Sequence, residues 1–269
     1  MTQTYVADRQ FPAHDLDQTS PPVVVALRGV SKIYGHGPGA VRALDDVSLE
    51  VRKGEFVCLV GASGCGKSTI LNMIAGLDRP TIGSIDLTDP RPAMMFQEPA
   101  LFPWLNVEQN VAFPLQMRHA GRSRRREEVA TLLRMVQLDG FARKRPHELS
   151  GGMRQRVALA RALAQGSPLM LMDEPFGALD AMMRDRLHEE IERLWQKAGL
   201  TVLFVTHNVR EAVRLGDRVL LLSSRPGRVA AEFPVHLPRP RRIESAEVAT
   251  LAATITDRLR EEAGGHAAA

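Results

Sequence analysis

The fold is decided by residues 56–69, which read Phe56-Val57-Cys58-Leu59-Val60-Gly61-Ala62-Ser63-Gly64-Cys65-Gly66-Lys67-Ser68-Thr69. An apolar run, 56–60, is followed at once by a glycine-rich turn and then by an amphipathic segment, 68–76. Strand, loop and helix in this order are the context in which the pattern G-x-x-x-x-G-K-[ST] is specific. We therefore expect a phosphate-binding loop here. The alternative is a glycine turn followed by a chance Lys-Ser pair.

The residue types of this loop are those that bind phosphate. Glycines let several backbone N–H groups point at one spot, and the following helix adds the positive end of its dipole. Lys67 is placed to reach the β- and γ-phosphates, and Ser68 supplies a hydroxyl for Mg²⁺. The predicted nucleotide-binding residues of the loop are Gly61, Ala62, Ser63, Gly64, Cys65, Gly66, Lys67, Ser68 and Thr69.

Polar residues also end three other apolar, strand-like runs. Residues 94–96 are followed by Gln97, residues 169–172 by Asp173 and Glu174, and residues 201–206 by His207. Two acids at the end of a buried strand are costly unless a cation meets them, so Asp173 suits Mg²⁺ and Glu174 is free to polarise a water. A histidine at a strand end is usually a satisfied polar residue. Because ligands of open α/β sheets bind at the carboxyl ends of strands, we favour a functional His207.

A second anion-binding helix start is predicted at Leu149-Ser150-Gly151-Gly152-Met153. Serine and two glycines at a helix start offer inward-pointing backbone donors. An ordinary N-cap explains Ser150 taken alone. It does not explain the glycines, so we favour the phosphate interpretation. Asp180 ends a short turn, 177–180, before a helix that we expect over 181–197.

Composition limits the class of protein. With 44% apolar and 25% charged residues, the chain is typical of a globular protein with a sizeable core. No apolar run approaches the roughly 20 residues of a membrane span, and we recognise no signal peptide, so we expect a cytoplasmic protein. A net charge of +4 is modest. The cluster 122–126 suits a solvated helix start, so we expect no nucleic-acid partner. We expect Cys58 and Cys65 to be unpaired.

Periodicity and composition divide the chain into three segments. We expect residues 1–22 to be a polar, flexible leader, residues 23–242 to form the main domain, and residues 243–269 to be a helix with a frayed tail. Residues 98–166 begin with prolines and then show helical spacing at 129, 132, 133 and 136, which indicates a helical insertion. We expect a flexible loop over 31–39. It carries Tyr34, whose ring either stacks on adenine or simply packs.

Taken together and in order, these motifs resemble those of the ATP-binding cassette (ABC) ATPases over residues 23–242. The resemblance implies an α/β fold. It consists of a P-loop NTPase (RecA-like) core, an antiparallel β subdomain, and an inserted α-helical subdomain at about 98–166. Residues 94–105, the turn Ser223-Ser224-Arg225-Pro226-Gly227-Arg228 and the connector 237–242 are similar to ATPase subunits of importers for nitrate, aliphatic sulfonates and taurine.

The resemblance also implies a mechanism that needs two copies of the chain. In a head-to-tail dimer with two ATP molecules, the phosphate loop of one subunit faces Ser150, Gly151 and Gly152 of the other. The implied roles are as follows: Lys67 and Ser68 hold phosphates and Mg²⁺, Gln97 senses both, Asp173 holds Mg²⁺, Glu174 is the general base, His207 positions the γ-phosphate and the water, Asp180 communicates across the dimer, and Tyr34 stacks on adenine. Met153 stands where the family most often has glutamine.

The implied partners are an integral membrane permease and, indirectly, an extracytoplasmic solute-binding protein. The ATPase would then lie at the cytoplasmic face of the membrane and drive uptake of a small anionic solute. Two alternatives stay open: a soluble ATPase of this class acting in DNA repair or translation, and an exporter subunit. The first is disfavoured because such relatives carry long coiled-coil insertions or two fused cassettes. Export is disfavoured by resemblance alone.

Overall fold

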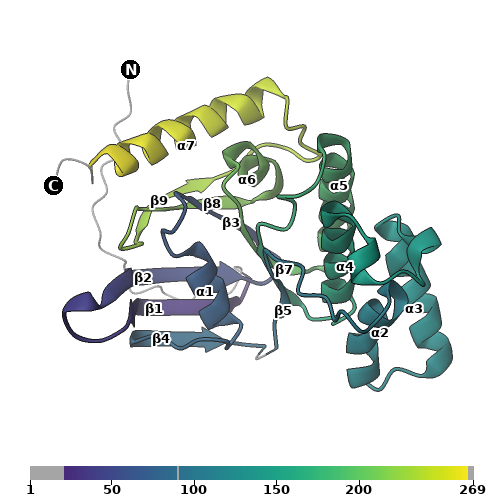
Figure 1. Ribbon diagram of the computed structural model, residues 1–269. Coiled ribbons are helices and arrows are strands. Elements are labelled where there is room, and N and C mark those ends of the chain that lie inside the picture. The colour runs from purple at the N-terminus through teal and green to yellow at the C-terminus, as the bar shows by residue number, and fades with distance from the viewer. Residues whose placement is uncertain (1–20, 90, 266–269) are drawn as a thin grey trace.

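The structure is a computed structural model that describes residues 21–89 and 91–265 of the 269-residue chain (Figure 1). The predicted leader therefore lies outside the described residues except for Pro21 and Pro22. Their carbonyl groups accept hydrogen bonds from Arg52 Nη1 (3.2 Å) and the Lys53 amide (2.8 Å). Of the predicted frayed tail, residues 266–269 also lie outside.

A six-stranded sheet forms the centre of the molecule, in the order β5-β6-β7-β3-β8-β9. All neighbouring strands are parallel except β8 and β9, which are antiparallel. The strands are β3 (Phe56–Gly61), β5 (Ala93–Met95), β6 (Leu169–Asp173), β7 (Thr201–Val205), β8 (Arg218–Leu222) and β9 (Val229–Pro234).

Both faces of this sheet are covered, so β3, β6 and β7 are buried at every position. Their sequences are accordingly continuous apolar runs and not alternating patterns. Successive side chains still point to opposite faces. Val57 and Leu59 pack in one apolar cluster with α1 (Lys67–Ile74) and the antiparallel sheet. Phe56 and Cys58 pack in the other cluster, with the remaining helices.

A three-stranded antiparallel sheet, β2-β1-β4, lies beside α1 (Figure 1). Its strands are β1 (Val23–Tyr34), β2 (Val41–Arg52) and β4 (Ile82–Leu87). The expected loop over 31–39 is therefore wrong in its first part, because β1 continues to Tyr34 by pairing with β2 at Val41. The short helix Gly37–Gly39 then makes the turn. Strand β4 was not predicted; its residues are mostly exposed and lack an apolar run.

The helices α2, α3 and α4 form the right-hand part of the molecule in Figure 1. They are α2 (Val107–Met117), α3 (Arg122–Met135) and α4 (Gly151–Leu163), with 3₁₀ turns at Asp139–Phe141 and Pro146–Glu148. Asn106 begins α2 with a capping box, in which its side chain accepts from the Gln109 amide at 2.8 Å. On α3, Val129 and Leu133 are buried as the spacing predicts.

The remaining helices are α5 (Ala181–Ala198), α6 (Val209–Leu215) and α7 (Ala246–Gly265). The connector before α7 is basic, as its sequence says, but two of its arginines are tied into the fold. Arg239 pairs with Glu192 at 2.7 Å and with Asp217 at 2.8 Å. Arg241 is buried and donates to the carbonyl oxygens of Val213 (3.0 Å) and Val235 (3.0 Å), among others. Burial lowers the pKa of its guanidinium to about 10.

Replacing Arg241 by methionine will leave several buried carbonyl groups without donors. We expect Arg241→Met to lower the free energy of unfolding by about 1–3 kcal/mol, the cost of orphaned buried polar groups. Arg242 is exposed and adjacent, so Arg242→Met is the matched control and should leave stability unchanged. Urea unfolding followed by circular dichroism measures both. Equal effects of the two substitutions would contradict this account of Arg241.

Candidate nucleotide-binding site

The glycines of the phosphate loop are required by their surroundings. A Cβ atom at Gly61 would lie 2.8 Å from Cys65 Sγ and 2.9 Å from the Leu222 carbonyl oxygen. Gly66 begins α1 with a φ of 102°, a conformation that side chains disfavour. The loop is therefore fixed in a tight curve between β3 and α1. That curve is the geometry in which backbone N–H groups bind phosphate.

Lys67 lies inside this curve. Its side chain is buried, and its Nζ donates to the carbonyl oxygens of Gly61 (2.8 Å) and Ala62 (3.0 Å). Cys65 Sγ lies 3.8 Å from the same Nζ. Both cysteines are free, as expected, and both are buried. The ammonium group is thus held at the loop, where it offers positive charge to an anion.

Asp173 and Ser68 form a pair suited to a divalent cation. Asp173 is buried, and its Oδ1 has no hydrogen-bond partner among the described residues. Burial raises the pKa of Asp173, while a hydrogen bond from Ser68 and the charge of Lys67 act against that rise. A buried carboxylate oxygen without a partner is costly. The donor set of hydroxyl and carboxylate fits Mg²⁺, which prefers oxygen ligands.

Gln97, Glu174 and His207 meet at the carboxyl ends of β5, β6 and β7. Glu174 Oε2 lies 3.1 Å from His207 Nδ1 and 3.4 Å from Gln97 Nε2. Glu174 has a φ of 44°, and its amide donates to the Val205 carbonyl oxygen at 2.9 Å. This strained backbone turns the carboxylate off the strand toward the other two side chains. The structure thus brings together three predicted residues from three separate strand ends.

Tyr34 lies at the end of β1 and is 43% exposed. Its hydroxyl donates to Asp78 Oδ2 at 2.8 Å, and Lys32 Nζ lies 4.8 Å from the ring centroid. Partial burial and the hydrogen bond to Asp78 raise the pKa of the phenol. A hydrogen bond with Thr69 acts in the opposite direction and links the ring to the phosphate loop.

The segment 150–152 packs against the turn that carries Asp180. Ser150 caps α4, accepting from the Met153 amide at 3.2 Å. A Cβ atom at Gly152 would lie 3.2 Å from the Ala178 carbonyl oxygen, so close packing within the chain also explains this glycine. Gln155 Oε1 accepts from the Ala178 amide at 3.1 Å. No hydrogen bond or ion pair of the described residues joins 150–152 to the phosphate loop.

Asp180 likewise acts as a cap within the chain. Its Oδ1 accepts from the Met183 amide at 2.9 Å and begins α5. The predicted roles of Ser150, Gly151, Gly152 and Asp180 concern a second subunit. They stay predictions.

The turn 223–228 contacts the phosphate loop, a role that the sequence did not reveal. Arg225 Nη2 and Nε donate to the Gly64 carbonyl oxygen at 3.2 and 3.3 Å. The Gly227 amide donates to the Ala43 carbonyl oxygen at 2.9 Å. Arg228 pairs with Asp45. The turn therefore joins the phosphate loop to β2. The Arg-Pro-Gly-Arg motif is recognisable in the sequence only as a similarity to importer subunits. Its contacts with the phosphate loop depend on the fold, which the motif does not specify.

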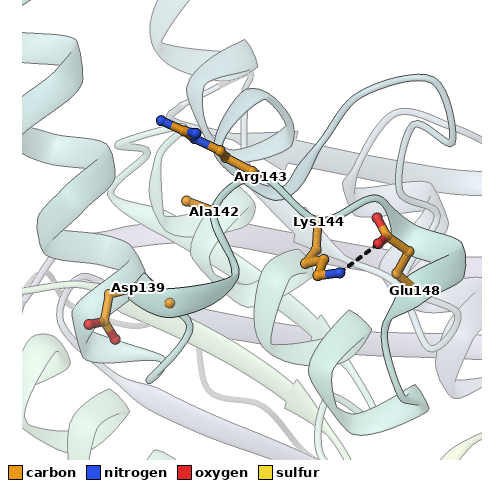
Figure 2. A pocket seen from close by; sticks show the side chains of 6 residues that line it. Asp139, Ala142, Arg143, Lys144 and Glu148 are labelled. Carbon is orange, nitrogen blue, oxygen red and sulfur yellow. Dashed lines mark hydrogen bonds and ion pairs between the residues drawn. The ribbon is translucent and has the colours of Figure 1, made fainter.

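A surface hollow of about 410 Å³ lies in the segment between α3 and α4, away from the phosphate loop in the sequence. Figure 2 shows the side chains that line it. It is lined by residues of one segment, 139–148. Lys144 Nζ and Glu148 Oε1 form an ion pair of 2.8 Å at its edge, which lowers the pKa of Glu148. None of the predicted site residues lines this hollow.

The phosphate loop, the Asp173–Ser68 pair and the Gln97–Glu174–His207 cluster together define a nucleotide-binding protein of the phosphate-loop class. The ABC transporter family matches residues 44–177. The nitrate import ATP-binding protein of Synechocystis sp. is 44% identical over 79% of this chain and 82% of its own length. The taurine import ATP-binding protein of Burkholderia pseudomallei is 46% identical over 78% of this chain and 84% of its own length.

Solved structures agree with these relatives. The dimeric structure of a bacterial ABC transporter cassette superposes with a TM-score of 0.74 at 35% identity, covering 80% of this chain and all of the other. A dimeric post-hydrolysis structure of the same cassette, bound to ADP and Pi, gives a TM-score of 0.73 at 36% identity, with the same coverage.

The chain belongs to the ABC transporter ATP-binding proteins, in the group that contains importer subunits. It is therefore an ATP-binding ATPase coupled to transport, and the predicted P-loop NTPase fold is confirmed. Within residues 21–89 and 91–265, no helix has the length and apolar character needed to cross a membrane. The individual site residues stay predictions, as do the segment boundaries.

Gly227 tests whether the turn 223–228 supports the phosphate loop. A Cβ atom there would overlap the Cys65 carbonyl oxygen. We expect Gly227→Ala to cost about 1–3 kcal/mol of stability, as overpacking does, and to weaken ATP binding. Gly140→Ala is the control, since no atom lies within 4 Å of its added Cβ. Thermal unfolding with and without ATP measures both effects, and a Gly227→Ala protein with normal stability and affinity would refute the contact.

Proposed function

We propose that this chain is the ATP-hydrolysing subunit of an importer for a small anionic solute such as nitrate, an aliphatic sulfonate or taurine. The observation that carries the proposal is the convergence of Gln97, Glu174 and His207 on one carboxylate oxygen at the strand ends. The names of the nitrate and taurine relatives support the choice of solute class.

In this proposal Glu174 is the general base and His207 holds the γ-phosphate and the attacking water in place. A carboxylate that accepts hydrogen bonds from His207 and Gln97 has a fixed orientation, which a positioned base requires. Residues 61–69 bind the phosphates through backbone N–H groups and Lys67. Tyr34 stacks on adenine with the ring face that does not lie under Lys32.

Mg²⁺ is assigned to Ser68, Gln97 and Asp173. No group of three or more His, Cys, Asp or Glu side chains suited to a metal exists among the described residues, so the site depends on this mixed donor set. The unpartnered Asp173 Oδ1 supports it. When bound, Mg²⁺ would supply positive charge to the phosphate oxygens, which phosphoryl transfer requires.

Two copies of the chain complete the site. In the proposed dimer, Ser150, Gly151 and Gly152 of one subunit face the phosphate loop of the other, and Asp180 lies between the two sites. The dimeric state of the similar cassettes supports this arrangement. ATP then holds the two subunits together, and its hydrolysis releases them.

The proposed partners are membrane permease subunits, with an extracytoplasmic solute-binding protein acting through them, at the cytoplasmic face of the membrane. The proposed ATPase domain comprises residues 23–242 and contains the helical subdomain at about 98–166. A leader, 1–22, precedes this domain, and the terminal helix, 243–269, follows it. We propose no nucleic-acid partner.

Glu174→Gln tests the proposed base. The amide keeps the shape of the side chain but cannot take a proton. We expect turnover to fall by roughly 10²–10⁴-fold. ATP binding should be retained, and dimers should accumulate on size-exclusion chromatography with Mg²⁺ and ATP. Glu189→Gln changes an exposed carboxylate on α5 and serves as the control. Wild-type turnover in Glu174→Gln would remove Glu174 from the mechanism.

Affinity purification from membranes tests the coupling partner. The importer proposal predicts that the tagged chain copurifies with an integral membrane permease in the presence of detergent. It further predicts that the solute-binding protein partnered with that permease binds nitrate, a sulfonate or taurine. Recovery of ribosomes or DNA in place of a permease would favour the soluble ATPase alternative. A permease without any solute-binding protein would favour export.

A further inference from the structure

A buried cluster of polar and charged side chains lies between α5 and α6. His188 is fully buried, and Thr206, Glu211 and Arg214 are each 5% exposed or less. His188 Nε2 lies 2.7 Å from Glu211 Oε1, and Arg214 Nη1 lies 3.2 Å from His188 Nδ1. Arg214 also pairs with Asp185 at 3.0 Å. Nothing in the proposed mechanism so far uses these residues.

The chemistry of these groups determines which atom donates and which accepts in each hydrogen bond of the cluster. Arg214 can only donate, so His188 Nδ1 accepts and His188 Nε2 carries the ring proton toward Glu211. The other oxygen of Glu211, Oε2, accepts a hydrogen bond from the Thr206 hydroxyl. Thr206 Oγ1 in turn accepts from the Asn208 amide at 3.0 Å. A continuous chain of hydrogen bonds therefore runs from Arg214 to the backbone at Asn208.

This chain of hydrogen bonds ends on both sides of His207. Thr206 precedes His207, and Asn208 follows it and caps α6 by accepting from the amides of Arg210 (3.1 Å) and Glu211 (3.3 Å). The side chain of His207 is 65% exposed and is bonded to Glu174. Its position therefore depends largely on the backbone at 206–208, which the cluster fixes.

The same cluster contacts the turn after Glu174. The ring of Phe176, two residues beyond Glu174, meets the His188 ring edge-on with a centroid distance of 4.9 Å. A small pocket of about 50 Å³ is lined by Glu174 and His207 together with Phe176, Thr206 and Glu211. His188 therefore connects to both segments of the site: to the turn after Glu174 through Phe176, and to the backbone around His207 through Glu211 and Thr206.

Stability alone does not explain such a cluster. Buried ion pairs carry a desolvation cost, and apolar side chains of similar volume are often as stable or more stable. What the hydrogen bonds of His188, Glu211 and Thr206 do provide is a fixed geometry, because each of these side chains has one orientation that satisfies its partners. Arg214 Nε, in contrast, is buried without a hydrogen-bond partner among the described residues.

We propose that His188, Glu211 and Thr206 are positioning residues that hold His207 and Glu174 in register for ATP hydrolysis. The proposal rests on the roles proposed above for Glu174 and His207. It predicts a defect in the chemical step and not in nucleotide binding, because none of the three belongs to the phosphate loop. Small misplacements of catalytic groups cost up to about 10²-fold in rate.

Three substitutions separate positioning from folding. Thr206→Val keeps the side-chain shape and removes the hydroxyl, and His188→Leu removes both hydrogen bonds of the ring. His188→Gln keeps an amide that can donate to Glu211. We expect Thr206→Val and His188→Leu to lower kcat roughly 10- to 100-fold with ATP affinity within about threefold. His188→Gln should restore most of kcat. Thr201→Val, at the opposite end of β7, loses a comparable bond to the Gly54 amide and should keep kcat.

A second readout is independent of turnover. If hydrolysis is slowed while ATP still binds, Thr206→Val should accumulate ATP-bound dimers on size-exclusion chromatography, as Glu174→Gln does. Normal kcat in a folded Thr206→Val protein would overturn the positioning role. So would a loss of ATP binding in step with a loss of stability. Should His188→Leu fail to fold, Thr206→Val decides alone. Full turnover in Glu174→Gln would instead refute the proposed base. The kcat of Thr206→Val and of His188→Leu is measured independently of that result, so the two failures can be told apart.

Discussion

The alignment of parallel strand ends is the constraint on which the site depends. Met95 pairs with Met172 and Asp173 pairs with Val205, so β5, β6 and β7 finish at one edge of the sheet. Gln97, Glu174 and His207 each follow such an end by one or two residues. A slip of one residue in any ladder would turn its side chains to the opposite face. The hydrogen bonds of the ladders therefore determine the distances within the cluster.

Much of this could be predicted from sequence because the signals were local. A buried apolar run is recognisable without knowledge of its neighbours, and a polar residue at its end marks the edge where ligands bind. The phosphate loop is local as well. The sequence marked Glu174 and His207 as residues at strand ends and the resemblance added Gln97; the structure brings Gln97 and His207 within hydrogen-bond distance of Glu174 Oε2.

The parts that could not be predicted depend on contacts between distant segments. Strand β1 extends to Tyr34 because β2 pairs with it, although its sequence there looks like a loop. Arg225 contacts Gly64 across 161 positions of the chain. His188 lies within the helix expected over 181–197, and only the packing of the fold places it against Glu211. Periodicity cannot report such pairs, since it describes one segment at a time.

The placement of Lys67 has a consequence for the thermodynamics of nucleotide binding. Its ammonium group already donates to the carbonyl oxygens of Gly61 and Ala62. A lysine side chain loses up to about 2 kcal/mol of rotational entropy when it is fixed, and here that loss accompanies folding of the chain. Binding of a phosphate group does not repeat it. The loop thus resembles a preorganised receptor, whose affinity is limited by desolvation and not by ordering of its own charge.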